Sequence, residues 1–80
     1  MHEFGIAENI LKTALTEAEK HQAKKISKIM VRLGQQNFLK PETLQGAFEI
    51  IAAKTIAAEA RIEAEEVPGI EITLTHLDIE

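Results

Sequence analysis

The spacing of apolar residues changes repeatedly along this chain, and that alternation restricts the fold more than any other feature. Spacings of three and four residues predict a helix over residues 3–21 and a second that opens at Pro41 and fades near Lys54 and Thr55. A spacing of two predicts strands over residues 24–33, 60–67 and 70–79. The order α-β-α-β-β indicates an α+β fold, with two helices packed on one face of a small three-stranded sheet.

The last two predicted strands are separated by Pro68-Gly69, a turn signal in which proline presets φ and glycine accepts φ > 0. We therefore expect residues 60–79 to form an antiparallel hairpin, which the first strand joins through a crossover to give a mixed sheet. The apolar phase slips between Leu74 and Leu77, which predicts a bulge or a strand end that turns over.

With 80 residues and 8.9 kDa, the chain has room for one domain, residues 1–80, with a thin stability margin. It has no cysteine, which excludes disulfides, iron–sulfur clusters, cysteine zinc sites and thiol catalysis within these residues. A deep enclosed active site is not expected in so small a core. Since the stability margin is thin, the chain could also form a homodimer.

The net charge of −4 and the absence of tryptophan and tyrosine argue against nucleic-acid binding. No apolar run approaches the ~20 residues of a membrane span, and no export signal opens the chain, so we expect a cytoplasmic protein. Residues 59–80 carry seven acidic side chains and one basic one. They form either a solvated face or an acidic docking surface.

Catalytic groups are scarce, and we expect that the chain is not an enzyme, with no catalytic residues. Ser27 is the only serine and lies far in sequence from any histidine. His21 ends the first helix, where a cap or dipole partner is the ordinary role. His76 stands beside Asp78, either as an exposed strand residue or as an auxiliary metal ligand or pH-sensitive contact.

The opening Met1-His2-Glu3 is chemically different. Methionine is retained before a bulky histidine, so the α-amine of Met1, the amide nitrogen of His2 and its imidazole can close adjacent chelate rings. A deprotonated amide nitrogen favours square-planar coordination, which suits Ni(II) or Cu(II). Glu3 can complete the set through its amide nitrogen or offer its carboxylate nearby. A histidine at position 2 also occurs by chance, so spacing alone leaves both interpretations open.

Several segments resemble the HypA family of nickel metallochaperones for [NiFe]-hydrogenase and urease maturation. The likeness covers nearly the whole chain and rests on the order and spacing of its segments, since no single motif is very specific. The matching segments are Met1-His2-Glu3-Phe4-Gly5-Ile6-Ala7, Ala23-Lys24-Lys25-Ile26, Val31-Arg32-Leu33-Gly34, Pro41-Glu42-Thr43-Leu44, Ala47-Phe48-Glu49, Thr55-Ile56-Ala57, Ala60-Arg61-Ile62-Glu63, Glu65-Glu66-Val67-Pro68 and Leu74-Thr75-His76-Leu77-Asp78-Ile79-Glu80.

The resemblance implies Ni(II) binding at Met1, His2 and Glu3, and delivery to hydrogenase or urease with a HypB-type GTPase and other maturation proteins as partners. Family members insert a zinc domain with two Cys-x-x-Cys pairs between the second and third strands. Here that position holds only Pro68-Gly69, so we expect no structural zinc and only the nickel-binding domain. The alternative is an interaction or regulatory module that kept the fold without delivering metal.

Overall fold

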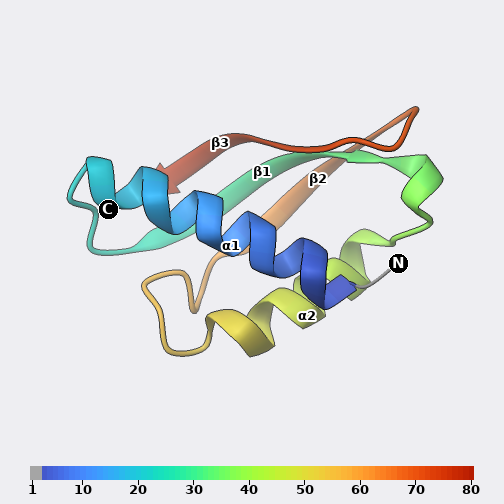
Figure 1. Ribbon diagram of the computed structural model, residues 1–80. Coiled ribbons are helices and arrows are strands. Elements are labelled where there is room, and N and C mark those ends of the chain that lie inside the picture. Colours follow the sequence, from blue (N-terminus) through green and yellow to red (C-terminus); the bar gives the residue numbers. More distant parts are fainter. Residues whose placement is uncertain (1–2) are drawn as a thin grey trace.

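In the computed structural model, which describes residues 3–80, two helices cover one face of a three-stranded sheet (Figure 1). The α+β prediction and its element order are confirmed. A short 3-10 helix, η1 (Gln35–Asn37), follows the first strand. The main elements are α1 (Glu3–Lys20), β1 (Ile26–Gly34), α2 (Pro41–Ala52), β2 (Arg61–Val67) and β3 (Ile72–Ile79).

The strand order is β2-β1-β3, with β1 parallel to β2 and antiparallel to β3. The predicted mixed sheet and crossover are confirmed, but the predicted antiparallel hairpin over residues 60–79 is wrong, because β1 lies between the two strands. The physical reason is burial. Strand β1 buries four apolar side chains, those of Ile26, Ile29, Val31 and Leu33. Strand β2 alternates exposed charged residues with half-buried ones, which suits an edge.

The segment joining β2 to β3 therefore passes across the end of β1 instead of making a tight hairpin turn. Two backbone bonds hold it there, Gly34 N–H to Glu71 O at 2.8 Å and Gln36 N–H to Gly69 O at 2.9 Å. Gly69 has φ +104°, as the turn prediction required. A Cβ on Gly34 would lie 2.5 Å from Gly69 O, so only glycine permits this approach.

The predicted phase slip in the last strand is a register shift in the pairing of β1 with β3. Met30 faces His76 while Val31 faces Leu74, which leaves Thr75 as the extra residue. The Thr75 hydroxyl donates to Met30 O at 3.2 Å. Because of this bulge, Leu74 and Leu77 both face the helices although they are three residues apart.

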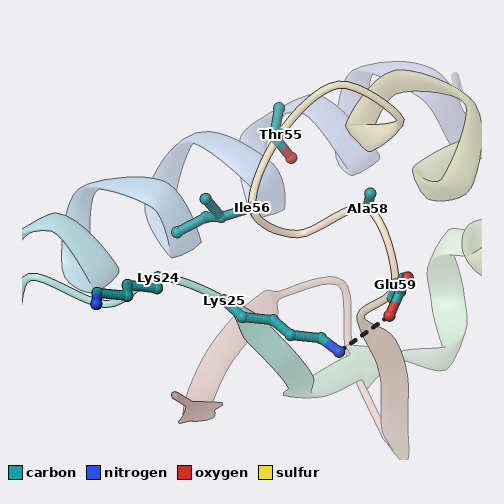
Figure 2. Close-up of a pocket in the computed structure, with 6 residues that line it drawn as sticks. All are labelled: Lys24, Lys25, Thr55, Ile56, Ala58 and Glu59. Carbon is teal, nitrogen blue, oxygen red and sulfur yellow. Dashed lines mark ion pairs between the residues drawn. The ribbon is translucent and has the colours of Figure 1, made fainter.

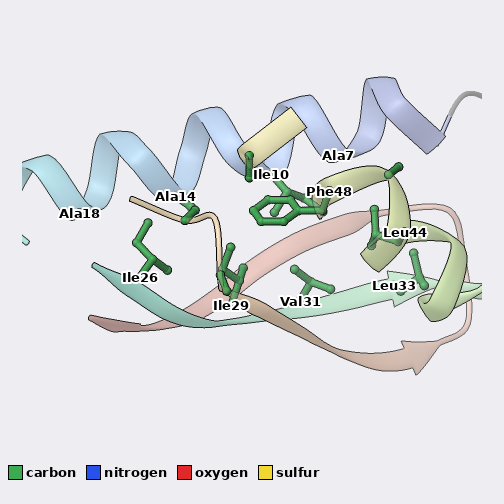
Figure 3. Close-up of a cluster of buried hydrophobic side chains, with 14 of the residues drawn as sticks. Ala7, Ile10, Ala14, Ala18, Ile26, Ile29, Val31, Leu33, Leu44 and Phe48 are labelled. Carbon is green, nitrogen blue, oxygen red and sulfur yellow. The ribbon is translucent and has the colours of Figure 1, made fainter. Parts of the chain in front are cut away.

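One hydrophobic core fills the space between the helices and the sheet (Figure 3). Phe48 of α2 is fully buried and its ring projects beneath α1. The predicted helix that opens at Pro41 buries Leu44, Ala47, Phe48 and Ala52. In α1 the buried residues are Ala7, Ile10, Ala14 and Ala18, and Phe4 is 43% exposed. The largest enclosed side chains are Phe48, Ile26, Ile29, Leu33, Leu44 and Val31.

Candidate metal centre

The predicted ligand set lies at the start of α1, and only Glu3 of its three residues belongs to the described part of the chain. Glu3 is the first residue of α1 and is half-buried. Met1 and His2 lie outside the described residues. The chelate of amine, amide nitrogen and imidazole therefore stays a prediction from the sequence.

The first turns of α1 are fixed by packing against α2. Ala7 is fully buried and Ile10 is 5% exposed, and both belong to the core that contains Leu44 and Phe48 (Figure 3). Packing against α2 therefore holds the part of α1 that directly follows Glu3. Figure 1 shows this end of α1 on the same side of the molecule as the start of α2, with Glu80 at the opposite end.

The other two histidines lie elsewhere. His21 follows the last residue of α1, about 27 Å from Glu3 along an 18-residue helix. His76 lies on β3, where its Nε2 is 2.9 Å from Asp78 Oδ1 and the ring is exposed. Within residues 3–80, no three histidine, aspartate or glutamate side chains are placed to hold a metal ion. The structure does not join His21 or His76 to Glu3.

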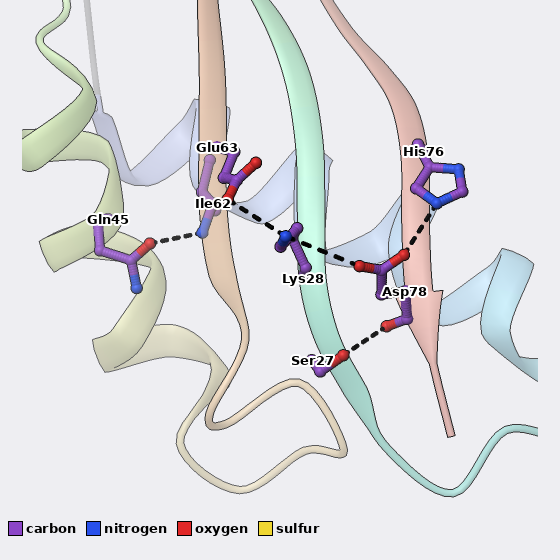
Figure 4. A network of polar contacts seen from close by, with 7 residues as sticks. All are labelled: Ser27, Lys28, Gln45, Ile62, Glu63, His76 and Asp78. Atoms are coloured by element: carbon purple, nitrogen blue, oxygen red, sulfur yellow. Dashed lines mark hydrogen bonds and ion pairs between the residues drawn. The ribbon is translucent and has the colours of Figure 1, made fainter.

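A row of charges crosses the face of the sheet that the helices leave open (Figure 4). Lys28 Nζ lies 3.3 Å from Glu63 Oε2 and 3.9 Å from Asp78 Oδ2, and His76 extends the row beyond Asp78. The Ser27 hydroxyl donates to the backbone oxygen of Asp78 at 3.2 Å. Lys28 therefore lies between two partly exposed carboxylates, and Ser27 is engaged in holding two strands together.

A shallow pocket lies at the end of the molecule where β1 begins, lined by Lys24, Lys25, Thr55, Ile56, Ala58 and Glu59 (Figure 2). Lys25 Nζ and Glu59 Oε1 are 2.9 Å apart. Their hydrogen bond and mutual attraction raise the pKa of Lys25 and lower the pKa of Glu59. Both groups are exposed, so this is a surface ion pair and not a buried reactive dyad.

The contact of His76 with Asp78 joins residues two positions apart, and that pair was named from the sequence. The contacts of Lys28, Ser27 and Lys25 were missed, because their partners are far apart in the chain. Gln45 of α2 is another case, since its Oε1 accepts the backbone N–H of Ile62 at 2.7 Å, 17 residues away. No local spacing signals such a pair.

In residues 3–80 there is no helix with the length and apolar character needed to cross a membrane.

Comparison with known proteins points to one family. The model for "Hydrogenase/urease nickel incorporation, metallochaperone, hypA" matches residues 1–72. Hydrogenase maturation factor HypA 2 of Bradyrhizobium diazoefficiens is 38% identical over 69 residues, covering 86% of this chain and 61% of the relative. Hydrogenase maturation factor HypA of Archaeoglobus fulgidus is 40% identical over 63 residues, covering 79% and 57%.

A solved structure shares the fold. The solution structure of the Ni metallochaperone HypA from Helicobacter pylori aligns with a TM-score of 0.83 over 99% of this chain and 97% of that chain, at 17% identity. The aligned part of this chain spans 61% and 57% of the length of the two curated relatives above. Similarity to these relatives therefore covers only part of each of them.

Proposed function

Because this chain belongs to the HypA family of hydrogenase and urease nickel-incorporation metallochaperones, we propose that it binds Ni(II) at its amino terminus and passes the ion to a maturation partner. The family is one of metallochaperones, not enzymes, which agrees with the scarcity of catalytic groups in the sequence. The observation that carries the proposal is the family match from residue 1, which includes Met1-His2-Glu3.

The chemistry of the terminus supports nickel as the cargo. The α-amine of Met1, the amide nitrogen and imidazole of His2, and an amide or carboxylate of Glu3 are nitrogen and oxygen donors that suit a square-planar ion. Each nitrogen must lose or lack a proton to bind, so nickel binding releases protons and the affinity falls as the pH falls. A terminal site can be dismantled by ligand exchange without unfolding the packed helix behind it.

The partners belong to the same proposal. A HypB-type GTPase and the maturation proteins of [NiFe]-hydrogenase or urease would receive the ion, in the cytoplasm. A cysteine zinc site does not fit these residues, because the chain has no cysteine. We propose that the short connection through Pro68-Gly69 stands where other family members carry their zinc domain, so that residues 1–80 form a single nickel-binding domain.

The test is a titration of Ni(II) into untagged protein with its native Met1, at pH 6 and pH 8, by calorimetry and visible absorption. We expect one equivalent at pH 8, a weak band typical of square-planar nickel, and weaker binding at pH 6. His2→Ala should lower the affinity more than about 100-fold, since even outer-sphere partners of a metal cost about 10- to 100-fold.

His21→Ala is the matched control, because it removes an exposed histidine from the far end of α1. It should leave the isotherm unchanged, whereas acetylation of the α-amine should abolish binding. Absence of saturable binding, or an equal effect of His2→Ala and His21→Ala, contradicts the terminal site. Partner binding that is indifferent to nickel would instead indicate the interaction module.

A further inference from the structure

The sheet has two outer edges, because β1 is the middle strand and β2 and β3 flank it. An outer strand presents backbone N–H and C=O groups that another strand can pair with, and natural proteins usually protect such edges with charge or with a covering group. The two outer strands of this protein differ in that protection.

The outer edge of β2 is protected twice. Gln45 of α2 accepts the Ile62 N–H at 2.7 Å and donates through Nε2 to Ala60 O at 3.2 Å, so a side-chain amide takes the place of a pairing strand (Figure 4). The strand also carries four charged side chains in seven residues, which oppose pairing with another chain. These are Arg61, Glu63, Glu65 and Glu66.

Strand β3 lacks both devices. Within residues 3–80, no side chain reaches it as Gln45 reaches β2, and the one side-chain hydrogen bond to its backbone comes from Ser27 of β1. Its first six residues, Ile72–Leu77, carry no formal charge when His76 is neutral, and Asp78 is its one acidic residue. An eight-residue edge of this composition is open to strand pairing.

The pattern of β3 identifies what it can pair with. About the midpoint between Thr75 and His76, the strand reads apolar-polar-apolar-polar and then the mirror of that order. An unbulged strand could not use this symmetry, because alternation would turn the mirrored residues to opposite faces. The bulge at Thr75 corrects the phase, so the apolar residues of both halves face the helices. These are Ile72, Leu74, Leu77 and Ile79.

We propose that β3 is the docking edge for a second copy of this chain, with the two β3 strands antiparallel. In that register Leu74 lies opposite Leu77 of the second copy, and Ile72 opposite Ile79 of the second copy. On the open face, Thr73 lies opposite Asp78 of the second copy. On the face toward the helices, apolar side chains meet apolar ones across the seam, which joins the two three-stranded sheets into one.

The surroundings of the edge fit this occupant. A groove between the end of α1 and β3 is lined by Glu17, His21, Leu74, Thr75, His76, Leu77 and Ile79. The apolar side chains of an added strand would continue into it. Because Thr75 is the extra residue of the bulge, the two Asp78 carboxylates would be about four strand rises apart along the seam. That is about 14 Å, which exceeds the screening length at physiological salt.

One consequence separates this register from others. Glu71 and Glu80 flank β3 and are exposed, and in the antiparallel pair each faces the other across the seam. Added salt should therefore strengthen the dimer by screening the two acidic pairs. An interface held by opposite charges would weaken under the same conditions.

The test is sedimentation equilibrium from about 10 µM to 1 mM, with a chelator present so that nickel cannot bridge two chains. We expect reversible dimerisation. Thr73→Glu places a negative charge opposite Asp78 of the second copy, twice per dimer, and should raise the dissociation constant about two- to thirtyfold. Thr73→Lys should lower it by a similar factor.

Within a single copy the two Thr73 substitutions have electrostatic effects opposite to those expected for the dimer. A change in the stability of one copy therefore cannot imitate the expected change in association. Thr73 faces Arg32 of β1, so Thr73→Glu is favourable and Thr73→Lys unfavourable within one copy. Thr43→Glu and Thr43→Lys, on an exposed position of α2, are the matched controls and should leave association unchanged. A wild-type chain that stays monomeric at 1 mM, equal effects of the two Thr73 variants, or the same shifts in the Thr43 variants would overturn the proposal.

Discussion

The interior beneath α1 and the amino-terminal end of the same helix perform separate tasks. In the interior, Ala7, Ala14 and Ala18 are fully buried and allow α1 to lie close to the sheet. At the amino-terminal end, Glu3 is only half-buried, and the ligands proposed for nickel lie at or before it. Stability should therefore depend on the interior, and metal binding on a few terminal atoms.

The difference teaches that the two properties can be changed one at a time. A substitution in the core should lower the free energy of unfolding and leave the nickel isotherm intact, provided that the protein stays folded. A substitution at His2 should do the reverse. The stability of each variant is measured by unfolding and its metal binding by nickel titration, so that any variant that moves both readouts contradicts the separation.

The largest effect is expected from Phe48→Ala. Phe48 is fully buried beneath α1, so its removal should lower the free energy of unfolding by ~3–5 kcal/mol. Phe38→Ala is the matched control, because Phe38 is 92% exposed, and it should change stability by less than about 0.5 kcal/mol. Similar losses in the two variants would contradict the position of the core.

A smaller effect is expected from Gly34→Ala. The added Cβ would lie 2.5 Å from Gly69 O, and since both atoms belong to backbone, the connection between β2 and β3 must shift. We expect a loss of about 1–3 kcal/mol in urea denaturation. Gly46→Ala meets nothing within 4 Å on α2 and should stabilise by about 0.5–1 kcal/mol.

The smallest effect is expected from Glu59→Gln, which removes an exposed ion pair with Lys25. The pKa of Glu59 is lowered on folding, so the ion pair stabilises the folded state at pH values above the usual pKa of glutamate. That stabilisation is lost as the pH falls through the lowered pKa of Glu59. The pKa of Lys25 is raised on folding, so deprotonation of Lys25 removes the stabilisation only at pH values above the usual pKa of lysine.

Between these limits the stabilisation by the pair is constant. Thermal unfolding at pH 7 should therefore show a small, salt-sensitive difference between Glu59→Gln and wild type, and the difference should shrink as the pH falls below about 4. A difference that persists at pH 3, or one as large as that of Gly34→Ala, would contradict this reading of the pair.

Local patterns predicted the elements well, because each depends on residues close together in the chain. The apolar spacing of Leu44, Ala47 and Phe48 predicted α2, and the phase slip after Leu74 predicted the bulge in β3. The pairing of strands depends on which edge of β1 each strand reaches. That is why Pro68-Gly69 suggested a hairpin that the fold does not contain.

The candidate site likewise has one part that could be predicted from the sequence and another that depends on the tertiary fold. The donor atoms of Met1-His2-Glu3 follow from covalent structure, so the sequence predicts their chelating ability directly. The support behind them, the packing of Ala7 and Ile10 in the same core as Leu44 and Phe48, follows from the tertiary fold. The roles of Gln45 and Glu59 could not be predicted, because their partners lie 17 and 34 residues away in the chain.

The central position of β1 also has a consequence for synthesis on the ribosome. Strand β1 is made early, but both of its neighbours, residues 61–67 and 72–79, are made later. Such non-local pairing slows folding, because long segments of chain must first be brought together. The proposed nickel ligands therefore leave the ribosome before the sheet beneath α1 can close, and a nascent chain shorter than residue 72 still exposes one edge of its central strand.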